Sequence, residues 1–109
     1  MTRIFVYTEP FQRAWKLMGL NDDSLLELEA ALLSDPRAGD VIEGTGGARK
    51  IRIRLEGRGK SGGGRVIYLD VFEHEHLYLL FAYPKNVQED ITFDQKKAIR
   101  KMIEKIQKE

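Results

Sequence analysis

The chain has 109 residues, a length that fits one domain, residues 1–109, and leaves little room for a second. It has no cysteine, which excludes disulfide bonds, zinc–thiolate sites and thiol catalysis, and its apolar fraction of 42% predicts one modest core. The net charge is only +1, so neither sign dominates the chain as a whole. No apolar run approaches the roughly 20 residues that span a membrane, and no signal peptide is recognisable, so a cytoplasmic protein is expected.

The N-terminal third of the chain is typical of one strand followed by two helices. Residues 2–7 are rich in β-branched and aromatic side chains, which favours a strand. Apolar residues three and four positions apart then indicate two helices, one with Phe11, Ala14, Trp15 and Met18 and one with Leu25, Leu28 or Glu29, Leu32 and Leu33. Pro10 and Gly19 fit the start and the end of the first helix. Asn21 or Asp22 caps the second helix, and the two should form an antiparallel hairpin.

The rest of the chain predicts three further strands and a last helix. After a glycine-rich connector over 37–48, residues 49–55 alternate, with Ile51, Ile53 and Leu55 on one face and Lys50, Arg52 and Arg54 on the other. The apolar runs at 65–72 and 77–83 are typical of central strands. Thr92 and Gln95 form a capping box, and the helix behind them carries Ile99, Met102, Ile103 and Ile106 on one face.

This order of elements predicts an α+β fold, since helices and strands are partly segregated along the chain. The expected architecture is an antiparallel-dominated four-stranded sheet with a helical hairpin on one face and a C-terminal helix. The three later strands should form a meander, with the first strand paired to one of them.

Positive charge is concentrated in one segment, between Arg49 and Arg65. Glu56 alone opposes seven cations there, so this segment carries +6 and the rest of the chain sums to −5. The cations are Arg49, Lys50, Arg52, Arg54, Arg58, Lys60 and Arg65. Such a concentration predicts a localised anionic partner, and a solvated basic strand is the alternative.

The same cations suit the cleavage of RNA. Attack by a 2′-hydroxyl takes a phosphodiester from one negative charge to two, and guanidinium groups match phosphate oxygens in a bidentate way. Fixed cations near the developing charge lower the barrier more than they stabilise the ground state. Tyr83 and Lys85 should lie on one side of the last strand, where an aromatic ring can stack on a base. Binding of RNA or DNA without catalysis is the alternative for these residues.

The other groups of polar residues do not predict a nucleotide, metal or catalytic site. Gly59-Lys60-Ser61 lacks the glycine that a P-loop needs five positions before its second glycine, and a strand follows it instead of a helix. The histidines, His74 and His76, are typical of an exposed polar turn, although a weak metal site is conceivable. Asp70 should be exposed or hydrogen-bonded, and Asp90 is typical of a turn. No cofactor and no metal are therefore expected.

Three segments resemble the HigB-like branch of the RelE/ParE toxin superfamily. They are residues 44–52 (GTGGARKIR), 57–68 (GRGKSGGGRVIY) and 80–86 (LFAYPKN). The likeness covers essentially the whole chain, because the order of elements is also that of the superfamily. It implies a RelE-like fold and a toxin of a type II toxin–antitoxin system. Such a toxin is a ribosome-dependent endoribonuclease that cuts mRNA in the ribosomal A site and so blocks translation.

The resemblance also implies a site and partners. Lys50, Arg52 and Arg65 match the basic residues that surround the scissile phosphate in such toxins, with Lys60 and Lys85 close by; with Tyr83 they are the candidate catalytic residues. Candidate RNA contacts are Arg49, Arg54, Arg58 and Asn86. Attack by the 2′-hydroxyl, without a metal, would leave a 2′,3′-cyclic or 3′-phosphate and a 5′-hydroxyl. A cognate antitoxin, expected to carry a helix-turn-helix, would silence the toxin, which would otherwise be monomeric.

The general base and the rival function stay open. RelE proteins carry an arginine just after the last-strand lysine and a tyrosine near the C-terminus, where this chain has Asn86 and Thr92-Phe93. Lysine and tyrosine have ordinary pKa values of about 10, but crowded cations would lower them, so Lys50, Lys60 or Tyr83 could serve as the base. The ParE side of the superfamily shares the fold and inhibits DNA gyrase by protein binding, without cutting RNA. The dense cations favour the ribonuclease.

Overall fold

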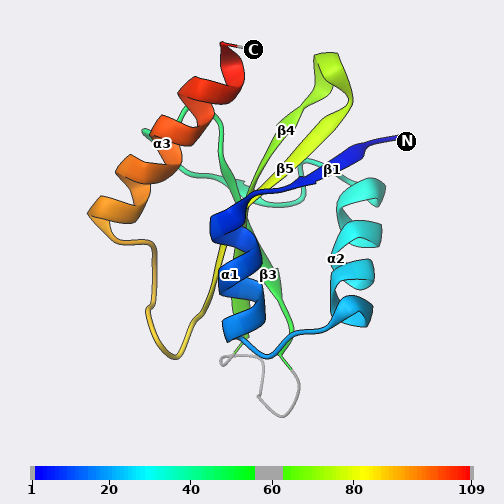
Figure 1. Ribbon diagram of the computed structural model, residues 1–109, viewed down its shortest axis with the longest axis vertical. Coiled ribbons are helices and arrows are strands. Elements are labelled where there is room, and N and C mark those ends of the chain that lie inside the picture. The colour runs from blue at the N-terminus through cyan, green and yellow to red at the C-terminus, as the bar shows by residue number, and fades with distance from the viewer. Residues whose placement is uncertain (1, 56–62, 109) are drawn as a thin grey trace.

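The computed structural model describes residues 2–55 and 63–108, which form a sheet with helices on both faces (Figure 1). Within these residues the sheet has five strands in the order β1-β5-β4-β3-β2. The strands are β1 (Ile4–Tyr7), β2 (Asp40–Val41), β3 (Arg49–Ile53), β4 (Gly64–Val71) and β5 (His76–Pro84). Their pairings are antiparallel except that β1 lies parallel to β5. The predicted α+β class is confirmed, whereas the predicted four-stranded sheet is corrected to a five-stranded mixed one.

The additional strand, β2, comes from the connector that was expected to be irregular. It pairs with the start of β3 through only two residues, too few for an alternating pattern to be visible in the sequence. The chain turns between β2 and β3 around the buried Thr45, whose hydroxyl donates to Ile42 O at 2.7 Å and accepts from Ala48 N at 3.1 Å. The glycines around Thr45 include Gly46 with a φ of 91°, a conformation that favours glycine.

The helices begin where the sequence predicted. They are α1 (Glu9–Leu17), α2 (Asp22–Ser34) and α3 (Phe93–Gln107). Thr8 caps α1, Asn21 rather than Asp22 caps α2, and Thr92 forms the predicted capping box with Gln95. In the part of the chain that is described, no helix is both long enough and apolar enough to cross a membrane.

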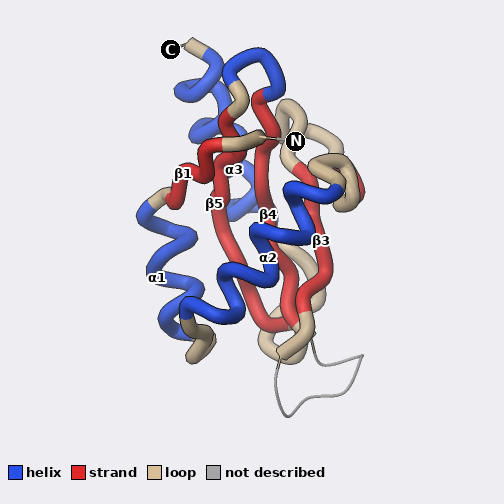
Figure 2. Tube along the Cα trace, turned by 90° about the vertical axis from the view of Figure 1, so that its right-hand side faces the viewer, coloured by secondary structure: helices blue, strands red, loops and turns tan. Residues whose placement is uncertain are grey.

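The two faces of the sheet hold separate halves of the core. α1 and α2 lie on one face, which we call the hairpin face, and α3 lies on the other, the α3 face (Figure 2). On the hairpin face, Phe11, Trp15, Leu28 and Leu32 pack against side chains of β4 and β5. On the α3 face, Ile99 and Ile103 pack against Ala48, Ile67, Leu69 and Leu80. The predicted apolar stripe of α3 is therefore part of the core.

A bulge in β5 decides which side chains of this strand face α3. Ile67 of β4 pairs with Phe81, but the next residue, Tyr68, pairs with Leu79, so Leu80 is an extra residue on β5. Strand side chains alternate between faces, and an extra residue reverses the alternation beyond it. Leu79 consequently belongs to the core on the hairpin face, whereas Tyr83, four positions later, belongs to the core on the α3 face.

Candidate active site

Four of the candidate catalytic side chains come together on the α3 face. Arg52 on β3, Arg65 on β4 and Tyr83 on β5 are Cα partners across the three strands, and partners in an antiparallel pair share a face. Lys50 lies two residues before Arg52 on β3 and therefore points the same way. We refer to Lys50, Arg52, Arg65 and Tyr83 as the polar row.

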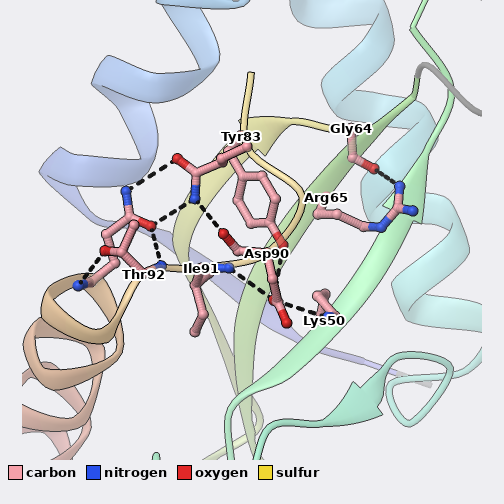
Figure 3. A network of polar contacts seen from close by, with 9 residues as sticks. Lys50, Gly64, Arg65, Tyr83, Asp90, Ile91 and Thr92 are labelled. Carbon is pink, nitrogen blue, oxygen red and sulfur yellow. Dashed lines mark hydrogen bonds and ion pairs between the residues drawn. The ribbon is translucent and has the colours of Figure 1, made fainter. Parts of the chain in front are cut away.

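Arg65 is held in the row by a close approach of three strands. A side chain on Gly63 would place its Cβ 2.5 Å from Ile53 O, so only glycine lets β3 pass this closely before Arg65. Gly63 O also accepts a hydrogen bond from Lys85 N at 2.9 Å. The Arg65 side chain is only 8% exposed, and its Nη1 donates to Gly64 O at 3.0 Å (Figure 3). The glycines that precede Arg65 thus fix where its guanidinium lies.

A carboxylate, Asp90, completes the site. It belongs to the segment between β5 and α3, and its Oδ1 accepts hydrogen bonds from Ile91 N at 2.8 Å, Lys50 Nζ at 3.1 Å and Tyr83 Oη at 3.4 Å (Figure 3). The sequence predicted only a turn residue here. Lys50 lies 40 positions earlier in the chain, so no local pattern indicates this contact.

Burial and Asp90 determine the protonation of Tyr83. Burial, together with the charge of Asp90 and its hydrogen bond, raises the pKa of Tyr83 to about 12, although Arg65 acts in the opposite direction. The net shift is therefore opposite to the one expected from crowded cations, and Tyr83 keeps its proton at neutral pH. Its ring is only 2% exposed and packs near Phe81 at 6.2 Å between centroids, so it is not available to stack on a base.

Asp90 itself is charged at neutral pH. Burial alone would raise the pKa of its carboxyl group, but the hydrogen bonds from Ile91 N and Lys50, with the charge of Lys50, lower it overall. Within the polar row, the Lys50 ammonium and the Tyr83 phenol therefore share one carboxylate.

The remaining candidates lie elsewhere or at the margin. Arg49 lies on the hairpin face, where its Nη1 donates to Gly39 O at 2.8 Å and to Arg37 O at 3.3 Å. Arg54 is exposed just beyond β3, while Lys85 is half-buried and Asn86 exposed just beyond β5. Arg58 and Lys60 fall outside the described residues.

The acidic and histidine residues that the sequence singled out lie away from the row. Asp70 forms an ion pair with Arg3 at 2.7 Å near the other end of β4, so of the two predicted alternatives, exposed or hydrogen-bonded, the second is confirmed. His74 lies in the turn between β4 and β5, and His76 begins β5, also at that end. Within residues 2–55 and 63–108, no group of three or more His, Cys, Asp or Glu side chains could hold a metal ion.

Solved structures of toxin RelE from E. coli share this fold. The free-state structure of a RelE mutant with two arginines replaced by alanine has a TM-score of 0.54 and 20% identity, covering 82% of this chain and 90% of that one. The isolated RelE toxin has a TM-score of 0.55 and 17% identity, covering 92% of this chain and 98% of that one. RelE in the intact RelBE toxin–antitoxin complex has a TM-score of 0.55 and 18% identity, covering 74% of this chain and 94% of that one.

These structures show that the chain has the RelE fold. Residues 2–109 match the family described as the RelE toxin of the RelE/RelB toxin–antitoxin system. The chain belongs to this RelE family.

Proposed function

We propose that the protein is an endoribonuclease of the HigB-like branch, which cuts mRNA on the ribosome and so blocks translation. The observation that carries the proposal is the polar row, in which two arginines and a lysine from β3 and β4 share one face of the sheet with a phenol from β5. Preorganised cations are suited to stabilise the second negative charge of a pentavalent phosphate. Membership of a family of ribonuclease toxins supports the same reaction.

In this proposal the cations of the row bind the scissile phosphate and the RNA 2′-hydroxyl attacks it. Arg52 and Arg65 offer the fork of N–H donors that fits phosphate oxygens, and Lys50 adds a point charge. Tyr83 keeps its proton at neutral pH, so it is suited to donate a hydrogen bond or a proton and not to act as the base. Because Lys50 acts here as a cation, Lys60 remains the candidate base, and Lys85 completes the proposed catalytic set.

The residues around the row would contact the rest of the RNA. Arg54 and Asn86 are exposed at the ends of two strands, and Arg58 is the third proposed contact. Arg49 is the weakest of the proposed RNA contacts, because its guanidinium is already hydrogen-bonded to two backbone carbonyls on the hairpin face.

A cognate antitoxin would silence this cytoplasmic toxin. The E. coli relative has been solved in a complex with its antitoxin, which supports a partner of the same kind here. An acidic antitoxin that covers the polar row would compete with RNA and bind in a salt-sensitive way. Its affinity should fall when Lys50, Arg52 and Lys60 are neutralised together. An unchanged affinity in this triple variant would place silencing on another face.

Induced expression in bacteria tests the proposed function. The wild-type chain should arrest growth, and mapped mRNA 5′ ends should show new termini within coding regions that carry a 5′-hydroxyl. Arg100→Ala, which removes an exposed cation on α3, is a matched control and should cut equally well. Growth arrest with DNA breakage and intact mRNA would instead identify a gyrase inhibitor of the ParE kind.

A further inference from the structure

Asp90 has no part in the proposed reaction, yet it contacts two members of the polar row. Its Oδ1 lies 3.1 Å from Lys50 Nζ and 3.4 Å from Tyr83 Oη, so one oxygen bridges side chains from β3 and β5 (Figure 3). β4 lies between these two strands. Asp90 therefore joins the two sides of the row above the central strand.

The position of Asp90 is itself fixed by hydrogen bonds at the start of α3. Its carboxylate accepts from Ile91 N at 2.8 Å, and its backbone carbonyl accepts from Gln88 Nε2 at 2.9 Å. Gln88 also pairs with Gln95 in the first turn of α3, at 2.7 and 3.3 Å, and Gln95 completes the capping box with Thr92. Asp90 is thus held by its own segment and can in turn hold Lys50 and Tyr83.

The placement of this carboxylate opposes RNA binding. A negative charge beside Lys50 repels a phosphate and offsets one of the charges that would attract it. An ion pair as exposed as this one, with 64% of the Asp90 side chain accessible, contributes little to folding. A long lysine side chain, by contrast, loses much rotational freedom when its ammonium is fixed. Asp90 thus favours neither RNA binding nor folding. Its contacts explain a different effect, which is to restrict the Lys50 and Tyr83 side chains to one arrangement.

We propose that Asp90 is a positioning residue, whose carboxylate holds the Lys50 ammonium and the Tyr83 hydroxyl at fixed places beside Arg65. The inference rests on the proposed ribonuclease function and extends it to a residue outside the predicted site. Because Asp90 acts on geometry while repelling phosphate, it should raise the rate of the bound complex without improving RNA affinity.

The first test separates rate from affinity in Asp90→Asn. Cleavage is measured at saturating concentrations of ribosome-bound mRNA, and affinity is measured with ribosomes that carry an mRNA whose 2′-hydroxyl is replaced by hydrogen at the cut site. Asp90→Asn should lower the saturated rate about tenfold and leave the affinity unchanged or tighter. Asp90→Glu should restore part of the rate, because it returns the charge. Glu89→Gln removes the same charge one residue away and should change neither quantity by more than about twofold.

Each outcome of this test has a distinct meaning. If the wild-type protein and Glu89→Gln both cut RNA and Asp90→Asn cuts it as fast at saturation, the positioning role is wrong and the ribonuclease stands. A loss of affinity in Asp90→Asn would make Asp90 an RNA contact or a structural residue instead, and would also overturn the inference. If the wild-type protein cuts no RNA, the proposed function fails, and the inference fails with it.

A second measurement checks the contact without any activity. Asp90 and Arg65 are the charged groups that act on the Tyr83 hydroxyl. Lys50 contacts the same Asp90 oxygen, and a cleft beside them is lined by Lys50, Asp90 and Lys96 of α3 together with Asp40 and Glu43. The phenolate titration of Tyr83 is identified among the four tyrosines by its absence in Tyr83→Phe. Asp90→Asn should move its midpoint down from about 12, since the carboxylate raises this pKa. An unmoved midpoint would show that the contact does not form in solution.

Discussion

Arg49 and Lys50 are neighbours on β3 that point to opposite faces of the sheet, and each face also buries a tyrosine. On the hairpin face, the Cα partner of Arg49 is Tyr68, whose hydroxyl donates to Pro36 O at 2.8 Å and accepts from Gly39 N at 2.9 Å. Arg49 itself donates to backbone carbonyls of the same connector. Arg49 and Tyr68 therefore find their polar partners in the main chain.

On the α3 face, the corresponding lysine and tyrosine share a side chain instead. Lys50 and Tyr83 both reach the carboxylate of Asp90, which is 64% exposed. A backbone carbonyl inside the fold is closed to a ligand, whereas an exposed carboxylate can hold Lys50 where a phosphate also reaches its ammonium. A cation and a tyrosine therefore serve folding on the hairpin face, where their partners are main-chain groups. On the α3 face a cation and a tyrosine serve the proposed site, where their partner is an exposed carboxylate.

The largest expected effect is that of Arg65. Arg65→Ala should lower RNA cleavage about 100- to 1,000-fold, as the removal of one preorganised donor to a transition state typically does. Arg65→Lys keeps the charge but not the fork, so it should also cut slowly. Because Arg65 is only 8% exposed, Arg65→Ala should also lose about 1–3 kcal/mol of stability, measured by thermal unfolding. A cleavage rate in Arg65→Lys equal to that of the wild type would remove the bidentate contact from the mechanism.

Alanine substitutions of Lys50 and Arg49, the adjacent cations of β3, should have opposite effects on activity and stability. Lys50→Ala should lower the cleavage rate at least tenfold while the melting temperature stays within a few degrees, since its ion pair is exposed. Arg49→Ala should lose about 1–3 kcal/mol of stability, because it leaves the carbonyl of the buried Gly39 without a partner, yet cut RNA normally when folded. Cleavage assays and urea unfolding of both variants test this. Equal losses of activity in the two would break the distinction between the faces.

Local patterns in the sequence were sufficient to predict most of the fold. Helix caps, apolar periodicity and the alternation on β3 depend on residues a few positions apart, so α1, α2, α3 and the main strands were found. β2 was missed because two residues carry no period. The parallel pairing of β1 with β5 was not specified, because it joins segments some 70 residues apart in the chain.

The site was less predictable than the fold, for two physical reasons. The extra residue at Leu80 reverses the alternation on β5 and so brings Tyr83 to the α3 face, and no turn signal marks it in an apolar run. Asp90 meets Lys50 only through tertiary folding, and burial together with the Asp90 charge then raises the pKa of Tyr83, against the direction expected from the cations alone. The identity of the cations was predictable from charge, but their partners were not.

Phenylalanine substitutions of the two buried tyrosines should change the free energy of unfolding by different amounts on the two faces. Tyr68→Phe removes the partner of both Pro36 O and Gly39 N in the buried connector and should destabilise the protein by about 1–3 kcal/mol. Tyr83→Phe removes one of three donors from the exposed carboxylate of Asp90. The loss of stability should therefore stay below about 1 kcal/mol. Urea unfolding at pH 7 measures both. A larger loss in Tyr83→Phe would mean that the α3 face depends on its polar contacts as much as the hairpin face does.

The smallest effect is expected in acid, where Asp90 titrates but the main-chain partners of Arg49 and Tyr68 do not. The pKa of Asp90 is lowered in the folded protein, so its contribution to stability is present above the ordinary value of 3.8 and is lost as the pH falls through the folded value. The group is largely exposed, so this contribution should stay below about 1 kcal/mol. The free energy of unfolding of the wild type and of Asp90→Asn is measured from pH 6 down to pH 2. The other carboxyl groups contribute equally to both proteins, so their effect cancels in the difference. The two curves should converge in acid, and a difference that is constant over this range would show that Asp90 contributes through its hydrogen bond to Ile91 N and not through its charge.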